Sequence, residues 1–209
     1  MTSAEPRRKR MPRAERERQM LAVAEEIFAA RGYLNTSVDD IAERVGVSKP
    51  MIYEYFGSKE GLLLATLRQA RGELFEASSR AVVGAATAEE ALRRAMTAFF
   101  RFVDEHRRSW ELLRNETALA GTGAMAEVEA IRNEQSQLNA TLISAFTPEV
   151  PQRQLEVLAE TLVGACERVA LWHVQREDST PEATAEYLMN VIWAGMAGLA
   201  DSYGVRDPK

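Results

Sequence analysis

The sequence of 209 residues has few of the side chains on which catalytic and metal sites depend. It holds two histidines, His106 and His173, and one cysteine, Cys166. Neither histidine has a second histidine four residues away, the spacing that binds zinc on a helix. A lone cysteine cannot form an internal disulfide and is typical of a reducing cytoplasm. We therefore expect no catalytic residues, no metal site and no cofactor, and an enzyme is the weakest of the functional classes considered.

Long apolar runs and alternating patterns are also missing. The longest strongly apolar stretch, residues 191–200, is half of the roughly 20 residues that a membrane-spanning helix needs. Near the N-terminus, the charged stretch PRAERERQ stands where a signal peptide would be apolar. No segment alternates with a period of two for long enough to predict a sheet. We expect a cytoplasmic protein with no membrane contact and an all-α fold.

The net charge of -5 is unevenly distributed. Residues 1–71 carry 13 Lys/Arg and 10 Asp/Glu, whereas residues 72–209 carry 13 Lys/Arg and 21 Asp/Glu. Seven of the basic residues fall within residues 1–18. A basic first third suggests that a polyanion binds the N-terminal end, although a solvated basic tail would give the same counts.

Helical periodicity and capping signals predict short helices near the N-terminus and longer ones after it. Residues 13–31 place apolar side chains on one stripe, and Gly32 follows as a stop. Thr36 or Ser37 can cap a second helix that ends at Gly46, and Ser48 can cap a third. Ser58 can cap a long helix over residues 59–83. Further helices are predicted at about 88–105, 107–119, 124–146, 152–176 and 182–203.

The third predicted helix lies in the stretch VSKPMIYEYFGSKEGLL, residues 47–63. If Ile52 is at the centre of its buried face, Phe56 lies beside it, whereas Pro50, Tyr53 and Glu54 point away. Two short helices joined by a turn that contains glycine are typical of a helix-turn-helix, whose second helix meets base edges near its N-terminus. Tyrosine hydroxyls, lysine ammonium groups and helix N-termini are suitable partners for phosphates.

The segment TSVDDIAERVGVSKPMIYEYFGSKEGLL resembles the helix-turn-helix of the TetR family of bacterial transcriptional regulators. The resemblance covers residues 13 to about 64 and rests on Thr36–Ser37, IAERVGVS, Ile52–Tyr53, Tyr55–Phe56 and SKE. Beyond residue 70 only the length and the helical layout match. Pro50 and Glu54 depart from the residues common in the family, which bears on base preference but not on the fold.

This resemblance implies an all-α homodimer with an N-terminal three-helix DNA-binding domain and a larger helical domain for ligand binding and dimerisation. We expect a basic, disordered arm at residues 1–12, the helix-turn-helix domain at residues 13–58 and the sensing domain at residues 59–209. The DNA contacts implied are to phosphates for Thr36 or Ser37, Tyr53 and Lys59, and to bases or the groove for Ser48, Lys49, Pro50, Met51 and Tyr55.

Two further sets of residues are predicted in the C-terminal domain. The last two helices are apolar on two faces, so one face is expected to pair with a second copy of the chain. The dimer interface is predicted to include Leu155, Leu162, Trp172, Leu188, Ile192, Gly195 and Leu199. A lipophilic effector is predicted to bind among Leu67, Phe99, Phe102, Val103, Trp110, Leu113, Leu138, Leu142, Val169 and His173.

The sequence thus predicts a ligand-responsive transcriptional regulator with double-stranded operator DNA as its partner. Because repression is more common than activation in the family that it resembles, we expect a repressor that leaves the operator when a small molecule binds. The alternatives are a ligand-independent, architectural DNA-binding protein and, less well supported, a helical enzyme.

Overall fold

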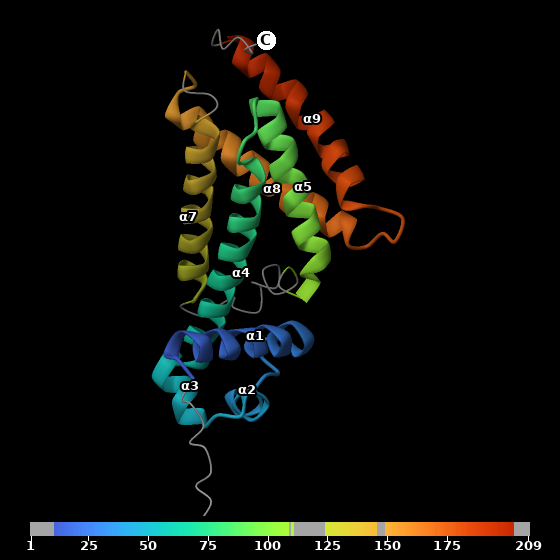
Figure 1. Cartoon of the computed structure of the whole chain (residues 1–209). Helices are drawn as coiled ribbons and strands as arrows, with labels where there is room; N and C mark the ends of the chain where they lie inside the picture. Colours follow the sequence, from blue (N-terminus) through green and yellow to red (C-terminus); the bar gives the residue numbers. More distant parts are fainter. Residues whose placement is uncertain (1–10, 109, 111–123, 146–148, 203–209) are drawn as a thin grey trace, which may run out of the picture.

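The computed structural model describes residues 11–108, 110, 124–145 and 149–202, and all regular structure in these ranges is helical. Figure 1 shows the helices, which are α1 (Arg13–Arg31), α2 (Val38–Val45), α3 (Lys49–Phe56), α4 (Lys59–Val82), α5 (Ala88–Glu105), α7 (Ala124–Ser144), α8 (Gln152–His173) and α9 (Pro181–Ser202). The all-α prediction is confirmed. The helix predicted at 107–119 and the arm predicted at 1–12 fall mostly outside the described residues. Among the helices of the described residues we find none that could span a bilayer.

The N-terminal helices begin and end where the capping residues predict. Ser37 caps α2 by accepting a hydrogen bond from the Asp40 backbone N–H, and the Asp40 carboxylate accepts one from the Ser37 N–H in return. Gly46 ends α2 with φ of 78°, a left-handed conformation that glycine adopts without strain. Ser58 caps α4 through Gly61 N–H, 2.9 Å from its hydroxyl oxygen. These caps separate α2, α3 and α4 over a short length of chain.

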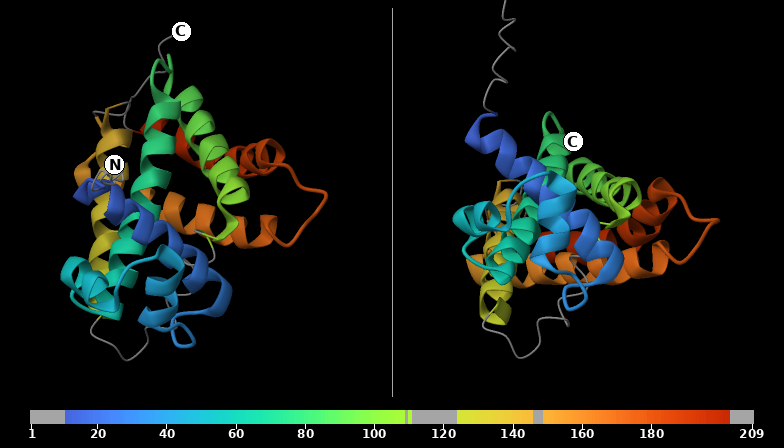
Figure 2. Two further views of the ribbon diagram at one scale, coloured as in Figure 1. Left: turned by 60° about the horizontal axis from the view of Figure 1, so that its bottom comes forward. Right: turned by 90° about the horizontal axis from the view of Figure 1, so that it is seen from below.

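Helices α1, α2 and α3 form a compact unit at one end of the molecule, from which α4 extends into the larger domain (Figure 1). There α4 runs beside α5 and α7, while α8 crosses behind this layer from the end of α7 and α9 packs along α5. Figure 2 shows the small unit from below, with α4 rising behind it. Because α4 contacts α1, α3, α5 and α7, it is the element that joins the two parts.

One apolar core runs through both parts. It includes Met20 and Phe28 of α1, Ile52 of α3 and Leu62 of α4, all at most 1% exposed, and continues to Phe100 of α5, which is fully buried. Burying a side chain of this size stabilises the fold by roughly 1.5–3 kcal/mol. The small unit is therefore packed against the larger domain through α4 rather than tethered by a flexible linker.

The junction between α3 and α4 requires a glycine. A Cβ atom on Gly61 would collide with the carbonyl oxygen of Phe56, at the end of α3. Gly72, on the same helix, has no atom within 4 Å of the position that its Cβ would occupy. Gly61 therefore allows the first turn of α4 to approach the end of α3. This close approach restricts the angle between the two helices.

We predict opposite effects for alanine at these two glycines. Gly61→Ala should lower the free energy of unfolding by about 1–3 kcal/mol, because the new methyl group overpacks a junction made of backbone. Gly72→Ala should raise it by about 0.4–1 kcal/mol, because alanine restricts the unfolded chain and fits the helix. Urea denaturation of both variants measures the difference, and a Gly61→Ala variant as stable as Gly72→Ala would contradict the close approach.

Candidate DNA-binding surface and effector cavity

Helix α3 presents the face that the sequence predicts. Ile52 is fully buried and Phe56 packs partly against the core, whereas Ser48, Pro50 and Glu54 are exposed. Tyr53 is 39% exposed. Ser48 is the N-cap residue of α3 but makes no side-chain capping hydrogen bond, so its hydroxyl does not close off the helix N-terminus. The N-terminal end of α3 is thus open to a phosphate or a base edge.

Three cations around α3 are held by other side chains. The Lys49 ammonium lies 2.7 Å from Asp39 Oδ2 on α2, and this hydrogen bond raises the pKa of Lys49. The Lys59 ammonium lies 4.3 Å from the centre of the Tyr33 ring, and partial burial lowers its pKa. The guanidinium of Arg13 lies 4.8 Å from the centre of the Tyr55 ring. The three cations therefore come from the first residues of α3, α4 and α1.

The other predicted DNA contacts differ in how exposed their side chains are. Thr36 is 3% exposed and its hydroxyl donates to the Gly32 carbonyl oxygen at 2.8 Å, so this residue closes the end of α1. Ser37 is exposed, which makes it the better of the two alternatives for a phosphate contact. Met51 and Tyr55 are half-buried and pack against the core. The sequence did not indicate Tyr33 or Arg13, because a cation over an aromatic ring leaves no recognisable spacing.

The larger domain contains a cavity of about 450 Å³ between α4, α5, α7 and α8. Its walls are mostly apolar and include Leu74 and Phe75 of α4, Leu92 and Met96 of α5, and Leu171 of α8. Cys166 also lines it, and burial raises the pKa of its thiol to about 12. The volume lies within the range of roughly 300–1,000 Å³ that is usual for small-molecule sites.

Only part of the predicted effector pocket lines this cavity. Phe99, Trp110 and Leu142 do, and the rings of Phe99 and Trp110 meet edge to face at 5.5 Å. Leu67 and Val103 are in the core beside it, Leu138 is 42% exposed, Val169 packs partly against the core, and Leu113 lies outside the described residues. Cavity and core cannot be told apart from sequence, because both require apolar side chains at helical spacing.

His173 is likewise absent from the cavity wall. It is 1% exposed, and its Nδ1 lies 2.9 Å from Thr184 Oγ1 and 3.3 Å from Ser179 Oγ. Its ring meets that of Phe100 at 5.9 Å. This histidine therefore ties the end of α8 to Ser179, just before α9, and to Thr184 on α9, and neither partner was apparent from the sequence.

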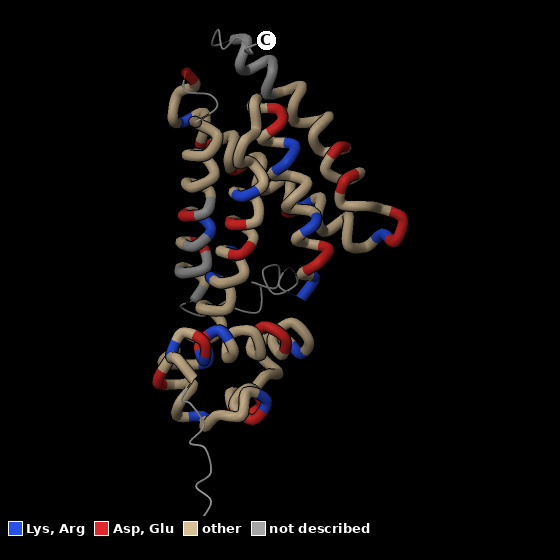
Figure 3. The backbone as a smooth tube through the Cα atoms, viewed as in Figure 1, with Lys and Arg blue, Asp and Glu red and all other residues tan. Residues whose placement is uncertain are grey.

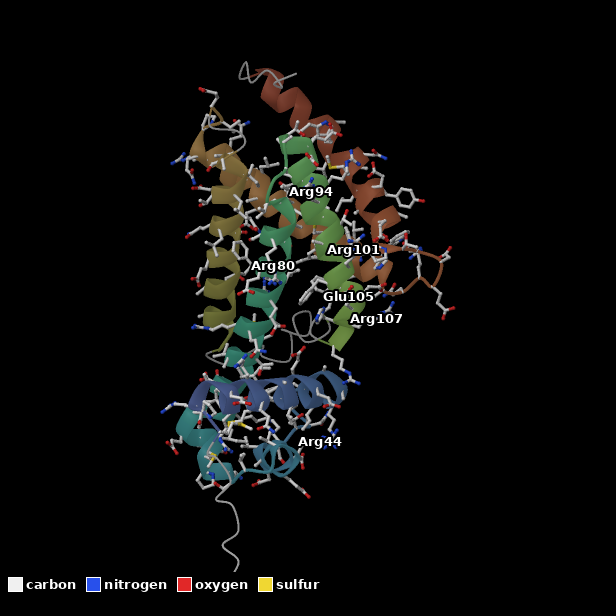
Figure 4. The ribbon with its side chains drawn as sticks, in the orientation of Figure 1. Arg44, Arg80, Arg94, Arg101, Glu105 and Arg107 are labelled. Atoms are coloured by element: carbon white, nitrogen blue, oxygen red, sulfur yellow. The ribbon has the colours of Figure 1, made fainter. Side chains whose placement is uncertain are left out.

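A second hollow, an open groove of about 720 Å³, lies between the outer faces of α4 and α5. Figure 4 labels Arg80, Arg94, Arg101 and Glu105, which all line it. Arg101 is paired with Glu182 at 2.7 Å, and Arg94 with Glu90. Phe102, predicted in the effector pocket, lines this groove and stacks on His106 at 4.3 Å. Charges of both signs alternate here, so the groove has no clear preference for an anion or a cation.

The outer face of α8 and α9 exposes large apolar side chains. Val157 and Trp172 of α8 are 66% and 38% exposed, and Tyr187 and Val191 of α9 are 63% and 74% exposed. In the part of α9 that Figure 3 colours, the charged residues lie near the beginning of the helix. Of the predicted interface, Trp172 and Gly195 are exposed on this face and Ile192 is half-buried. Leu155, Leu162 and Leu188 are buried inside the chain instead, and the Leu199 side chain lies outside the described residues.

A helix-turn-helix unit joined to a helical domain with a lipophilic cavity defines a class of ligand-sensing DNA-binding proteins. Residues 20–66 match the family described as bacterial regulatory proteins of the tetR family, and residues 88–195 match the tetracyclin repressor-like C-terminal domain. The chain therefore belongs to the TetR family and is a transcriptional regulator.

Relatives cover most of the chain. It is 27% identical over 188 residues to the transcriptional activator FasR of Mycolicibacterium smegmatis, covering 90% of this chain and 86% of FasR. A TetR-like regulator from Rhodococcus sp. RHA1 superposes with a TM-score of 0.71 at 34% identity, covering 90% of this chain and all of that one. FadR of Bacillus subtilis, solved with stearoyl-CoA, has a TM-score of 0.70 over 84% of this chain and 96% of its own. At 17% identity, that likeness concerns the fold alone.

We predict that Lys59 contributes a phosphate contact. Lys59→Ala should weaken binding to all DNA sequences about equally and reduce the slope of log K against log salt by about one unit. Binding titrations by fluorescence anisotropy over a series of salt concentrations measure the slope. Arg80→Ala, on the outer groove, is the control and should leave the slope unchanged. A Lys59→Ala variant that altered base preference at an unchanged slope would show that the lysine reads bases.

Proposed function

We propose that the chain acts in the cytoplasm as a homodimeric repressor that binds operator DNA and is released when a small lipophilic molecule enters the cavity. In this proposal residues 13–58 bind DNA and residues 59–209 sense the ligand and dimerise. The phosphate contacts are made by Ser37, Tyr53 and Lys59, and Ser48, Lys49 and Pro50 face the groove. The relative FasR is named an activator, and loss of DNA affinity would end activation as well as repression.

The observation that carries this proposal is the position of α4. One face of α4 lines the cavity through Arg71, Leu74 and Phe75, and its first turns are buried against α1 and α3. A ligand that displaces α4 would therefore move α3, and in a dimer it would change the distance between the two recognition helices. Because half-sites on one face of DNA require a fixed spacing, such a displacement lowers affinity.

The energetics of this release are favourable. Converting a population that is mostly bound into one that is mostly free takes about 5.5 kcal/mol of differential binding. A ligand of micromolar affinity has roughly 8 kcal/mol in total. The cavity also favours this proposal over a ligand-independent architectural protein, because an architectural role gives no reason for a space of about 450 Å³ lined with apolar side chains.

The homodimer is supported by the exposed apolar face of α8 and α9. Val157 and Trp172 follow one stripe of α8, together with the small exposed residues Thr161 and Gly164. On α9, Tyr187 and Val191 lie one turn apart and are followed by Ala194 and Gly195. Contiguous exposed apolar residues mark contact surfaces, and a surface that pairs with its own copy is the usual solution. Glycine and alanine in these stripes would let helix backbones approach closely.

We predict that a charge on this face prevents dimerisation. Val191→Glu should give a monomer at micromolar concentration, because dimer formation would bury an unpaired carboxylate. Val83→Glu is a matched control, since Val83 in the α4–α5 connection is equally exposed at 74%. Sedimentation velocity separates the two states. A wild-type chain that sediments as a monomer would contradict the homodimer itself, and a dimeric Val191→Glu variant would contradict the face.

A second prediction tests the cavity as the effector site. Ala95→Phe should fill part of the cavity, so that DNA binding persists while the effector no longer releases the complex. Ala98→Phe introduces the same side chain on the same helix but into the open outer groove, and should respond normally. DNA-binding titrations with and without a candidate effector compare them. Equal responses from both variants would show that the effector binds elsewhere.

A further inference from the structure

Glu54 lies on the outermost side of α3. With about 100° of rotation per residue, Glu54 and Pro50 both fall within roughly 20° of the direction opposite Ile52. Ile52 is fully buried, and Pro50 and Glu54 are both exposed. Met51 and Tyr53 lie on the two flanks between these sides. Because the Ile52 side of the helix faces the core, Pro50 and Glu54 are the residues of α3 that would enter a major groove furthest.

The Glu54 carboxylate keeps its capacity to accept hydrogen bonds. It is the one acidic side chain in the sequence of α3, and among the described residues it makes no hydrogen bond or ion pair. Lys49 on the same helix is held by Asp39 of α2 at 2.7 Å, and the cations of Lys59 and Arg13 lie over tyrosine rings. Water surrounds this carboxylate in the free protein, whereas inside a DNA groove it requires a donor from a base.

The major groove offers few donors to a carboxylate. Cytosine presents its N4 amino group there, whereas thymine presents the acceptor O4 and guanine the acceptors O6 and N7. Adenine presents an N6 donor beside an N7 acceptor, which repels a second carboxylate oxygen. A carboxylate directed at phosphates would only lower the affinity for every sequence. Cytosine is therefore the base that best matches an acidic side chain in this position.

We propose that Glu54 is a specificity-determining residue that accepts a hydrogen bond from N4 of one cytosine in each half-site of the operator. This inference rests on the proposed binding of operator DNA through α3 and adds a base contact to it. At this base position the order of preference is cytosine, then adenine, then thymine and guanine. The phosphate contacts of Ser37, Tyr53 and Lys59 supply affinity, whereas Glu54 discriminates between bases.

The experiment compares the base preferences of the full chain with those of three variants. Wild-type protein, Glu54→Ala, Glu54→Gln and Glu43→Gln are each incubated with a library of randomised double-stranded DNA, and the bound fraction is sequenced. The wild-type protein should select a motif with one such cytosine in each half-site. Exchanging that cytosine for thymine in one half-site should weaken binding about tenfold in fluorescence anisotropy titrations, within the usual cost of one mismatched base pair.

The two Glu54 variants should change the preference at that position alone. Glu54→Ala removes the acceptor, so exchanging cytosine for thymine should change the affinity by about twofold or less. Glu54→Gln can pair with N6 and N7 of adenine, so the preference should move from cytosine to adenine. Glu43 is an exposed carboxylate of α2, and Glu43→Gln removes the same charge from the same unit. This control should keep the wild-type preference at every position. Circular dichroism confirms the fold of each variant.

The remaining outcomes separate this inference from the proposed function. If both Glu54 variants bind every sequence more tightly by one factor and keep the wild-type motif, the carboxylate only repels phosphates. The inference is then overturned, while operator binding stands. If the position that depends on Glu54 prefers another base, the hydrogen bond to cytosine is overturned. If the wild-type protein enriches no motif, both operator binding and the role of Glu54 are overturned.

Discussion

Burial of the first half of α4 is the interaction on which the rest of the structure depends. Leu62, Leu63, Leu64 and Leu67 are at most 7% exposed, so the helix is apolar on nearly every side over these turns. A helix with this pattern must be surrounded, and α4 contacts α1, α3, α5 and α7. This packing helps to set the orientation of α3 relative to the larger domain, because α3 buries only Ile52 fully and contacts α4.

The N-terminal unit could be predicted from the sequence because its helix ends are encoded locally. Ser37, Ser58 and Gly46 act within a few residues of their own positions, and each requires only a hydrogen bond or a positive φ angle. The buried side of α3 followed from the spacing of Ile52 and Phe56. What the sequence could not show is how the cations of this surface are held, because Lys49 finds its partner on α2 and Lys59 finds its partner in the segment between α1 and α2.

The larger domain was predicted less well, for a physical reason. Leu155 and Leu162 of α8 follow one apolar stripe and Val157 lies on another, and hydrophobicity alone does not determine which of them faces the chain's own core. In the structure the leucine stripe is buried and Val157 is exposed. The cavity poses the same problem, because its wall is distinguished from core by missing neighbours, which are a property of packing between α4, α5, α7 and α8. Leu67 and Val103 could not be separated from Phe99 on the basis of residue type.

The contacts of Lys59 explain how a change in the larger domain could reach a phosphate. Lys59 is in the first turn of α4, and its ammonium lies over the ring of Tyr33, in the segment between α1 and α2. The Tyr33 ring in turn lies 5.9 Å from that of Phe28, which is 1% exposed in the core shared with α4. A movement of α4 against α1 therefore changes the position of Lys59 and, together with it, the position of the Tyr33 ring. Because packed side chains change between discrete arrangements, a small displacement at Arg71 or Leu74 would favour one arrangement of this contact over another. Effector and DNA would then oppose each other through the same helix. By thermodynamic linkage, operator DNA would weaken effector binding by the same factor by which the effector weakens DNA binding.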